Sequence, residues 1–113
     1  MSLRKNKFTL KRLKSKNTLD ALFSNKNSHN TKNLVLKILK KENALFLFAG
    51  VSVPKKNFKK AVERNKIKRQ LRQGLKNIEN KLPFGGSCML IYKGKKPPLT
   101  AEVIDETEAL FFK

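Results

Sequence analysis

The sequence has few acids and almost no cysteine, histidine, tyrosine or tryptophan, and cysteine and histidine are too rare for a disulfide-bonded fold or a Cys/His metal site. Its 113 residues include one Cys, one His, one Tyr and no Trp. Cys88 therefore has no partner for an internal disulfide. His29 lies among Asn and Ser with no second metal-type ligand nearby. We interpret Cys88 as a small core residue of a buried strand and His29 as a loop residue.

Long hydrophobic runs are also missing. The longest, ALFLFAGV at 44–51, is far shorter than the roughly 20 residues that a transmembrane helix needs. The basic start of the chain lacks the apolar stretch of a signal peptide. We therefore expect a cytoplasmic protein of one domain, 1–113, with a flexible basic N-terminus over 1–15 and no membrane partner.

Lysine and arginine greatly outnumber the acidic residues in this chain. The chain has 27 Lys and Arg against 8 Asp and Glu, a formal net charge of +19. Residues 1–100 hold all but one of the bases, whereas 101–113 hold half of the acids. Solubility needs only a few net charges, and a surplus this large opposes compaction unless a polyanion neutralises it. The charge therefore predicts a nucleic acid partner, with an anionic membrane surface as the alternative.

The hydrophobic pattern predicts an α+β protein. We expect helices over 16–24, 58–82 and 101–112, strands over 34–40, 44–53 and 87–94, and a polar loop over 24–33. The first two strands are expected to pair as an antiparallel hairpin, with 44–53 central because it is apolar on both faces. Val103, Thr107, Leu110 and Phe111 should face inward from the last helix, capped by Thr100. This order of elements favours a two-layer sandwich, a small, mainly antiparallel sheet with helices packed on it.

The segment 58–82 combines an apolar stripe with a basic flank. The stripe recurs at spacings of four, four, three and four: Ile67, Leu71, Leu75, Ile78 and Leu82. At about 100° per residue, one flank of this stripe carries the side chains that we call the basic strip: Arg64, Asn65, Lys68, Arg69, Arg72 and Lys76. Gly74 should weaken this helix by roughly 1 kcal/mol relative to Ala.

The basic strip has no acids to balance it. None occurs between Arg64 and Ile78, so the stabilising Glu–Lys pairs four residues apart are absent and like charges repel. Phosphates along the strip would remove this repulsion, and Arg can bind each with two hydrogen bonds. Because the strip should lie against the body of the protein, we favour backbone recognition of folded RNA over a recognition helix in DNA. A structural RNA binder of ribosomal type and a DNA-binding module remain alternatives.

Catalytic side chains are not evident in this sequence. The basic body shows no clustered His, no paired carboxylates and no phosphate-cradling Gly motif. The acids near the C-terminus belong to one amphipathic helix and are expected to be solvated. We therefore predict no catalytic residue and no metal ligand on the protein itself.

A family resemblance adds to this interpretation. The segment VSVPKKNFKKAVERNKIKRQLRQ, 51–73, resembles the signature of the bacterial ribonuclease P protein subunit. The residues that match are Ser52, Lys55, Lys56, Ala61, Val62, Arg64, Asn65, Lys68, Arg69 and Arg72. The segment 12–23 resembles the N-terminal helix of the family less specifically. The sequence departs from the family pattern in four places: Lys66 replaces an Arg, Lys59-Lys60 a usual Gly-Asn, Leu19 a common Phe, and Lys37 a frequent aromatic residue.

The resemblance implies a fold and a function. The fold would be that of the second domain of ribosomal protein S5, with a left-handed βαβ crossover. The protein would assist an RNA subunit that cleaves the 5′ leader from precursor tRNA using RNA-bound Mg²⁺, and no protein partner would be required. The implied RNA-binding residues are Lys55, Lys56, Arg64, Asn65, Lys66, Lys68, Arg69 and Arg72. The implied leader cleft is formed by Leu19, Phe23, Val35 and Lys37.

Overall fold

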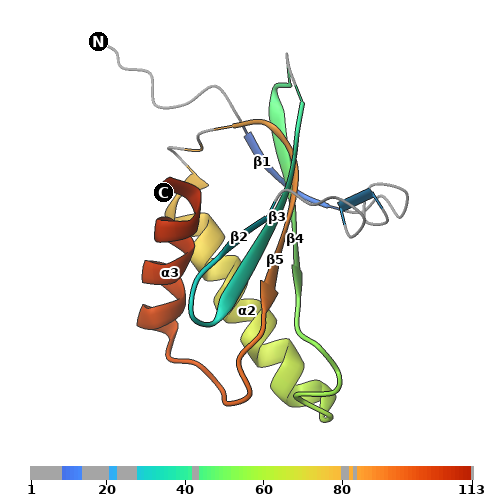
Figure 1. Cartoon of the computed structure of the whole chain (residues 1–113), viewed down its shortest axis with the longest axis vertical. Coiled ribbons are helices and arrows are strands. Elements are labelled where there is room, and N and C mark those ends of the chain that lie inside the picture. The colour runs from blue at the N-terminus through green and yellow to red at the C-terminus, as the bar shows by residue number, and fades with distance from the viewer. Residues whose placement is uncertain are drawn as a thin grey trace.

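The described residues form a five-stranded sheet with two helices on one face (Figure 1). The computed structural model describes residues 9–13, 21–22, 28–41, 44–79, 82 and 84–112. In chain order the elements are β1 (Thr9–Arg12), β2 (Ser28–Asn30), β3 (Leu34–Lys40), β4 (Phe46–Ser52), α2 (Ala61–Asn77), β5 (Gly86–Tyr92) and α3 (Thr100–Phe112). This is the α+β sandwich that the sequence predicted.

The strand order is β1-β4-β5-β3-β2. The β1–β4 and β4–β5 pairs are parallel, whereas β3–β5 and β2–β3 are antiparallel. The sheet is therefore mixed and not mainly antiparallel. The connection from β4 through α2 to β5 is the one for which the resemblance predicts a left-handed crossover.

The expected hairpin of 34–40 with 44–53 is wrong, because β5 lies between these two strands. The reason is burial. Cys88, Met89 and Leu90 are successive residues of β5 and all are buried, so both faces of this strand are covered. A strand that needs cover on both faces takes the centre of the sheet. β4 also has a neighbour on each side, but only one of its faces is buried, since Leu47 and Ala49 are covered while Phe46 and Phe48 are exposed.

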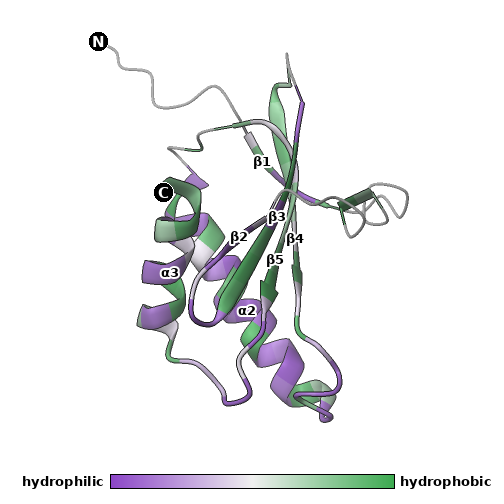
Figure 2. Cartoon of the chain, viewed as in Figure 1, coloured by the Kyte–Doolittle hydropathy of each residue, from purple (hydrophilic) through white to green (hydrophobic). Residues whose placement is uncertain are grey.

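The main core fills the space between the sheet and the helices. Leu34, Leu36 and Ile38 of β3 face this core, whereas Val35 and Lys37 point to the opposite, open face of the sheet. Figure 2 shows hydrophilic residues on the outward sides of α2 and α3. Helix α3 buries Val103, Thr107, Leu110 and Phe111, as the sequence predicted. The mildly acidic C-terminal segment therefore covers the core.

Helix α2 is shorter than the expected 58–82, but the residues beyond its ends remain part of the core. Phe58 precedes the helix, Ile78 and Leu82 follow it, and all three are buried. The stripe therefore predicted burial correctly and overestimated helix length.

Gly74 lies where α2 and α3 approach closely. A Cβ atom added to Gly74 would lie 2.7 Å from Oγ1 and 3.2 Å from Cβ of Thr107. Thr107 is fully buried, and its hydroxyl donates a hydrogen bond to the Val103 carbonyl at 2.7 Å. A glycine that lowers helix propensity is thus required at this position by the packing of the two helices.

The hydrophobic pattern did not predict two of the strands. β1 falls in the N-terminal segment that was expected to be flexible, and pairs in parallel with β4. β2, which includes His29, falls in the expected polar loop. Both are short edge strands without apolar alternation, so periodicity could not find them. Of the expected helix 16–24, Ala21 and Leu22 are helical, and the rest lies outside the described residues.

Candidate nucleic-acid interface

The basic strip of α2 lies on an accessible flank of the helix. Arg69, Arg72, Asn65 and Lys76 are exposed, and Arg64 and Lys68 are half-buried. Lys66 belongs to the predicted RNA-binding set but not to the strip, and it is exposed on another side of the helix. Lys55 and Lys56 are exposed in the turn that follows β4. All the predicted RNA-binding side chains can thus be reached at least partly by a partner.

Arg64 also has a structural role within the protein. Its guanidinium donates hydrogen bonds from one nitrogen to the carbonyl oxygens of Phe58 and Lys59, both at 2.9 Å. The residue before the helix, Lys60, supplies no side-chain cap. Arg64 therefore stabilises the connection that leads from the lysine turn into α2, and only part of its hydrogen-bonding capacity remains for phosphate.

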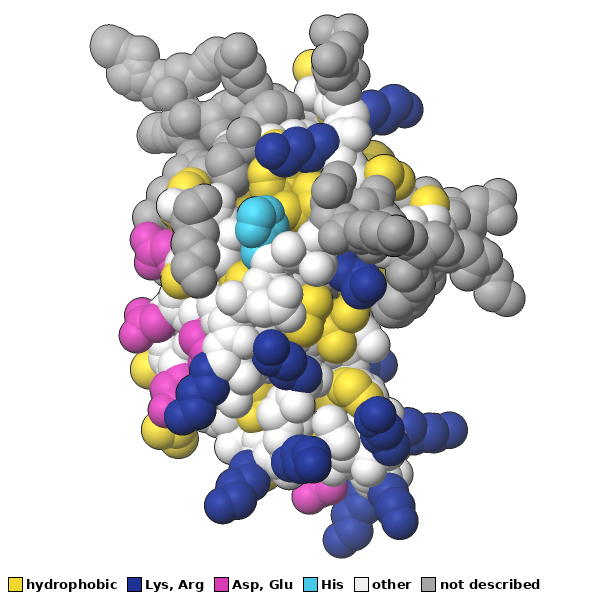
Figure 3. Space-filling model, viewed as in Figure 1, with side chains coloured by type: hydrophobic (Ala, Val, Ile, Leu, Met, Phe, Trp, Pro, Cys, Tyr) yellow, Lys and Arg dark blue, Asp and Glu magenta, His cyan; other side chains and the backbone are white. Residues whose placement is uncertain are grey.

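Basic side chains gather at one end of the molecule. On the face of the molecule that Figure 3 shows, Lys and Arg side chains surround the lower end, whereas most acids lie along the edge formed by α3. The exposed bases at this end come from the connection before α2 and from the one after β5: Lys55, Lys56, Lys59, Lys60, Lys93, Lys95 and Lys96. Asn57 links the two connections by donating a hydrogen bond to the Gly94 carbonyl at 3.4 Å.

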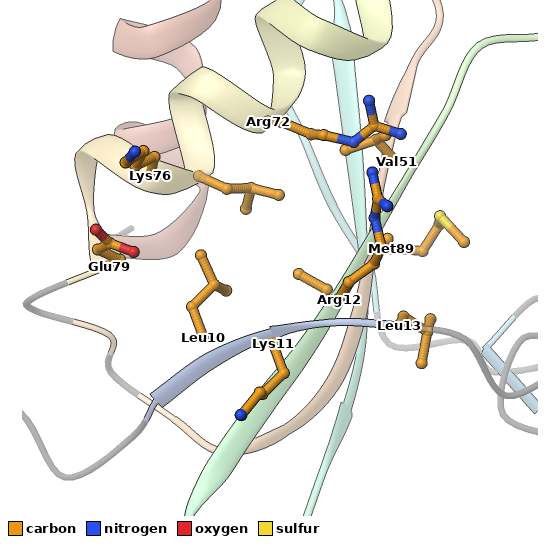
Figure 4. A pocket seen from close by; sticks show the side chains of 12 residues that line it. Leu10, Lys11, Arg12, Leu13, Val51, Arg72, Lys76, Glu79 and Met89 are labelled. Atoms are coloured by element: carbon orange, nitrogen blue, oxygen red, sulfur yellow. The ribbon is translucent and has the colours of Figure 1, made fainter.

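A groove of about 390 Å³ separates the basic strip from β1. Figure 4 shows the guanidinium groups of Arg12 and Arg72 pointing toward the same space, with Lys76 and Glu79 near the other end. Two guanidinium groups that face one space favour an anion between them. Arg12 was missed as a site residue because its segment was expected to be flexible. The parallel pairing of β1 with β4 places Arg12 opposite Ala49, at the groove that Arg72 of α2 also lines.

The open face of the sheet carries the described part of the predicted leader cleft. Val35 and Lys37 are half-buried there, while Leu19 and Phe23 lie outside the described residues. Leu22 is fully buried but is not part of the main core. In Figure 1 the short helical segment that contains it lies on the side of the sheet away from α2 and α3. The middle of the open face is therefore partly covered.

The sequence also failed to indicate two exposed aromatic residues. Phe46 and Phe48 of β4 point to the open face, where their ring centroids are 5.9 Å apart. Apolar residues on both faces of a strand predict that it is buried, but they do not say which face another element covers. The alternation of exposed and buried residues in β4 appears only in the folded structure.

One acid of α3 is bound within the protein and not simply solvated, contrary to expectation. The Glu106 carboxylate accepts hydrogen bonds from the Thr31 hydroxyl at 2.6 Å and from the Asn33 backbone and side-chain amides at 3.1 and 3.0 Å. Partial burial alone would raise the pKa of Glu106. The hydrogen bonds from Thr31 and Asn33, with the charge of Lys32, lower this pKa below its ordinary value. Glu106 therefore fastens the β2–β3 turn to α3 as a carboxylate.

Two absences hold for the residues that the structure describes. Their His, Cys, Asp and Glu side chains form no group of three that could hold a metal ion. None of their helices is long and apolar enough to cross a bilayer.

The fold and the basic strip define an α+β protein with a surface suited to nucleic acid, and the comparisons with known proteins identify its family. The sequence profile of the family described as Ribonuclease P matches residues 9–113. Over 96 residues the chain is 32% identical to the ribonuclease P protein component of Brevibacillus brevis, covering 85% of this chain and 75% of that protein. The chain belongs to the ribonuclease P protein family, as residues 51–73 indicated.

Solved structures share its fold. The ribonuclease P protein of Thermotoga maritima superposes with a TM-score of 0.76 at 22% identity, covering 89% of this chain and 94% of that one. The protein from Staphylococcus aureus gives 0.73 at 23% identity, covering 88% and 90%. RNA binding and tRNA processing follow from the family, and the ribonuclease P RNA is the partner.

Proposed function

We propose that the protein binds the ribonuclease P RNA through the basic strip and the lysine turn, and the 5′ leader of precursor tRNA through the open face of the sheet. The observation that carries this proposal is the arrangement of the family motif. The motif bases lie on an accessible flank of α2 and in the turn before it, with no acid in the strip. A phosphate backbone is the partner that such a surface fits.

Cleavage of the precursor is assigned in this proposal to the RNA subunit. Bound Mg²⁺ would activate a water molecule for attack on the scissile phosphodiester. The described residues offer no cluster of metal ligands, so we assign Mg²⁺ to RNA phosphates. The protein would hold the leader, and so distinguish precursor from product, in the cytoplasm.

Reconstitution tests the proposal. The purified protein and its matching ribonuclease P RNA are combined at low Mg²⁺, and cleavage of a 5′-extended precursor tRNA is followed. We expect correct cleavage only when both components are present. Tight RNA binding without any effect on cleavage would instead support a structural RNA binder of ribosomal type. Preference for duplex DNA at matched salt would support a DNA-binding module.

Two variants of α2 make the test specific to the strip. Arg69→Ala removes an exposed strip base and should weaken binding to the RNA subunit by about 10-fold or more, because hydrogen bonds to charged groups contribute roughly 1.5–3 kcal/mol. Gln73→Ala removes an exposed polar side chain of the same helix outside the strip, and should leave binding unchanged. Equal losses from both variants would contradict the assignment of the strip.

A further inference from the structure

The open face has an aromatic pair that neither the family motif nor the predicted leader cleft includes. Phe46 and Phe48 are 38% and 39% exposed, although Leu47 between them is fully buried. Their rings lie 5.9 Å apart at an interplanar angle of 50°. Single exposed apolar side chains are ordinary on protein surfaces. Two neighbouring phenylalanines that offer ring surface on the same sheet face are a candidate binding feature.

Lysines surround this pair. Lys11 is the register partner of Phe48 on β1, and its Nζ atom lies 5.3 Å from the centroid of the Phe46 ring. Lys41 lines a hollow of about 690 Å³ that reaches both rings. Lys40 also lines this hollow, but its Nζ atom lies 5.7 Å from the centroid of the Phe84 ring, which packs against the main core. The described residues of this hollow include no acid: Leu39, Lys40, Lys41, Ala44, Leu45, Phe46, Phe48, Gly86 and Ser87. An apolar partner gains nothing from these charges, whereas a phosphate backbone is attracted by them.

The register of the strands places the pair next to the predicted leader cleft. Phe48 pairs with Ser87, which pairs with Leu39 on β3. The adjacent row on the same face, two residues further along each strand, consists of Gly50, Met89 and Lys37. The aromatic pair therefore extends the open face from Lys37 toward the end of the sheet where β4 begins.

We propose that Phe46 and Phe48 stack on unpaired bases of single-stranded RNA, whose phosphates contact Lys11 and Lys41. Every base has a flat aromatic face, so such stacking tolerates any sequence. Paired bases of an RNA helix are stacked on each other and offer no free face, so the surface selects single strands. The inference rests on the proposed function, because it assigns this RNA as part of the 5′ leader. Base stacking, which the resemblance would place at position 37, is then supplied by β4.

Binding to the reconstituted complex tests the pair. The substrates are a precursor tRNA with a long leader, blocked at the scissile phosphate, and the same molecule with its leader cut back to one nucleotide. Phe46→Ala and Phe48→Ala should each raise the Kd of the long-leader substrate by about 5- to 150-fold, the range for loss of one base–aromatic stack. The Kd of the short-leader substrate should not change. The matched control is Phe112→Ala, which removes a 45%-exposed ring from α3 and should alter neither value.

A direct readout uses the absence of Trp from the chain. Phe48→Trp keeps an aromatic face and should retain long-leader affinity, and stacking of a leader oligoribonucleotide should quench its fluorescence. Unchanged long-leader affinity in both alanine variants would overturn the inference, as would an equal loss in Phe112→Ala. Self-association of the wild-type protein through this surface, lost in Phe48→Ala, would also overturn it. If the wild-type protein fails to stimulate cleavage, the proposed function fails, and quenching of Phe48→Trp still decides whether the pair binds single-stranded RNA.

Discussion

Gly74→Ala should destabilise the protein even though alanine is the better helix former. In an open helix the change would contribute about 1 kcal/mol of stability. Here the new Cβ atom would lie 2.7 Å from the Thr107 hydroxyl oxygen and 3.5 Å from the Val103 carbonyl oxygen. Thr107 is fully buried and its hydroxyl is held by a hydrogen bond, so it cannot move without loss. Overpacking of a core costs about 1–3 kcal/mol, and the expected net effect is a loss of up to about 2 kcal/mol.

A double-mutant cycle isolates the cause. Thr107→Ala removes the oxygen that the new Cβ would meet at 2.7 Å and leaves a contact at 3.2 Å. Gly74→Ala should therefore be less destabilising in the Thr107→Ala background, by about 0.5 kcal/mol or more. The free energy of unfolding is measured by urea titration and circular dichroism at fixed phosphate concentration, because anions that bind the folded state stabilise it. An increase in stability from Gly74→Ala in the wild-type background would refute the close approach of α2 and α3.

Three other expectations follow from the contacts described above. Arg64→Ala should lower both the free energy of unfolding and the RNA affinity, because the Arg64 guanidinium donates hydrogen bonds to the Phe58 and Lys59 carbonyls. Arg69→Ala should lower the RNA affinity alone, and Glu63→Ala should lower neither quantity. Urea titration measures the stability of each variant, and a binding isotherm measures its RNA affinity. The folded state lowers the pKa of Glu106, so its contribution to stability is complete above the ordinary Glu pKa and is lost as the pH falls through the lowered value. Glu106→Gln should reduce stability near neutral pH and flatten the acid side of the stability–pH profile, and a profile identical to wild type would contradict this. Burial raises the pKa of the Cys88 thiol to about 12, so a thiolate-directed reagent at mildly alkaline pH should modify it in urea but not in the folded protein.

The sequence predicted the parts of the fold that depend on local periodicity. The apolar stripe of α2, the inward face of α3 and the buried face of β3 all follow from spacing along one element. Strand order does not. The short connection between β3 and β4 favoured a hairpin, and only the covering of β5 on both faces separates them. Pairing of this kind depends on which elements cover each face of the sheet, and a single sequence does not contain that information.

In the candidate site, too, local patterns were predictable from the sequence and contacts between distant segments were not. The strip was predictable because a row of bases without acids is visible on a helical wheel. The contribution of Arg12 was not, since it depends on β1 pairing with β4 at the edge of the sheet. The carboxylate of Glu106 gave no signal either, because its partners, Thr31 and Asn33, are more than seventy residues away in the chain.

The two flanks of α2 explain how the protein tolerates its charge. Gly74 and Gln70 mark the flank that meets α3 and the connection before it, where Gln70 donates hydrogen bonds to the Pro98 carbonyl and the Thr100 hydroxyl, both at 3.0 Å. The strip occupies the opposite flank, where Arg72 faces β1. The acids of α3 therefore lie across the helix from the strip, and cannot compete with phosphates for its bases. Because α2 is held by neutral contacts on one flank, the unbalanced charge on the other remains available for RNA.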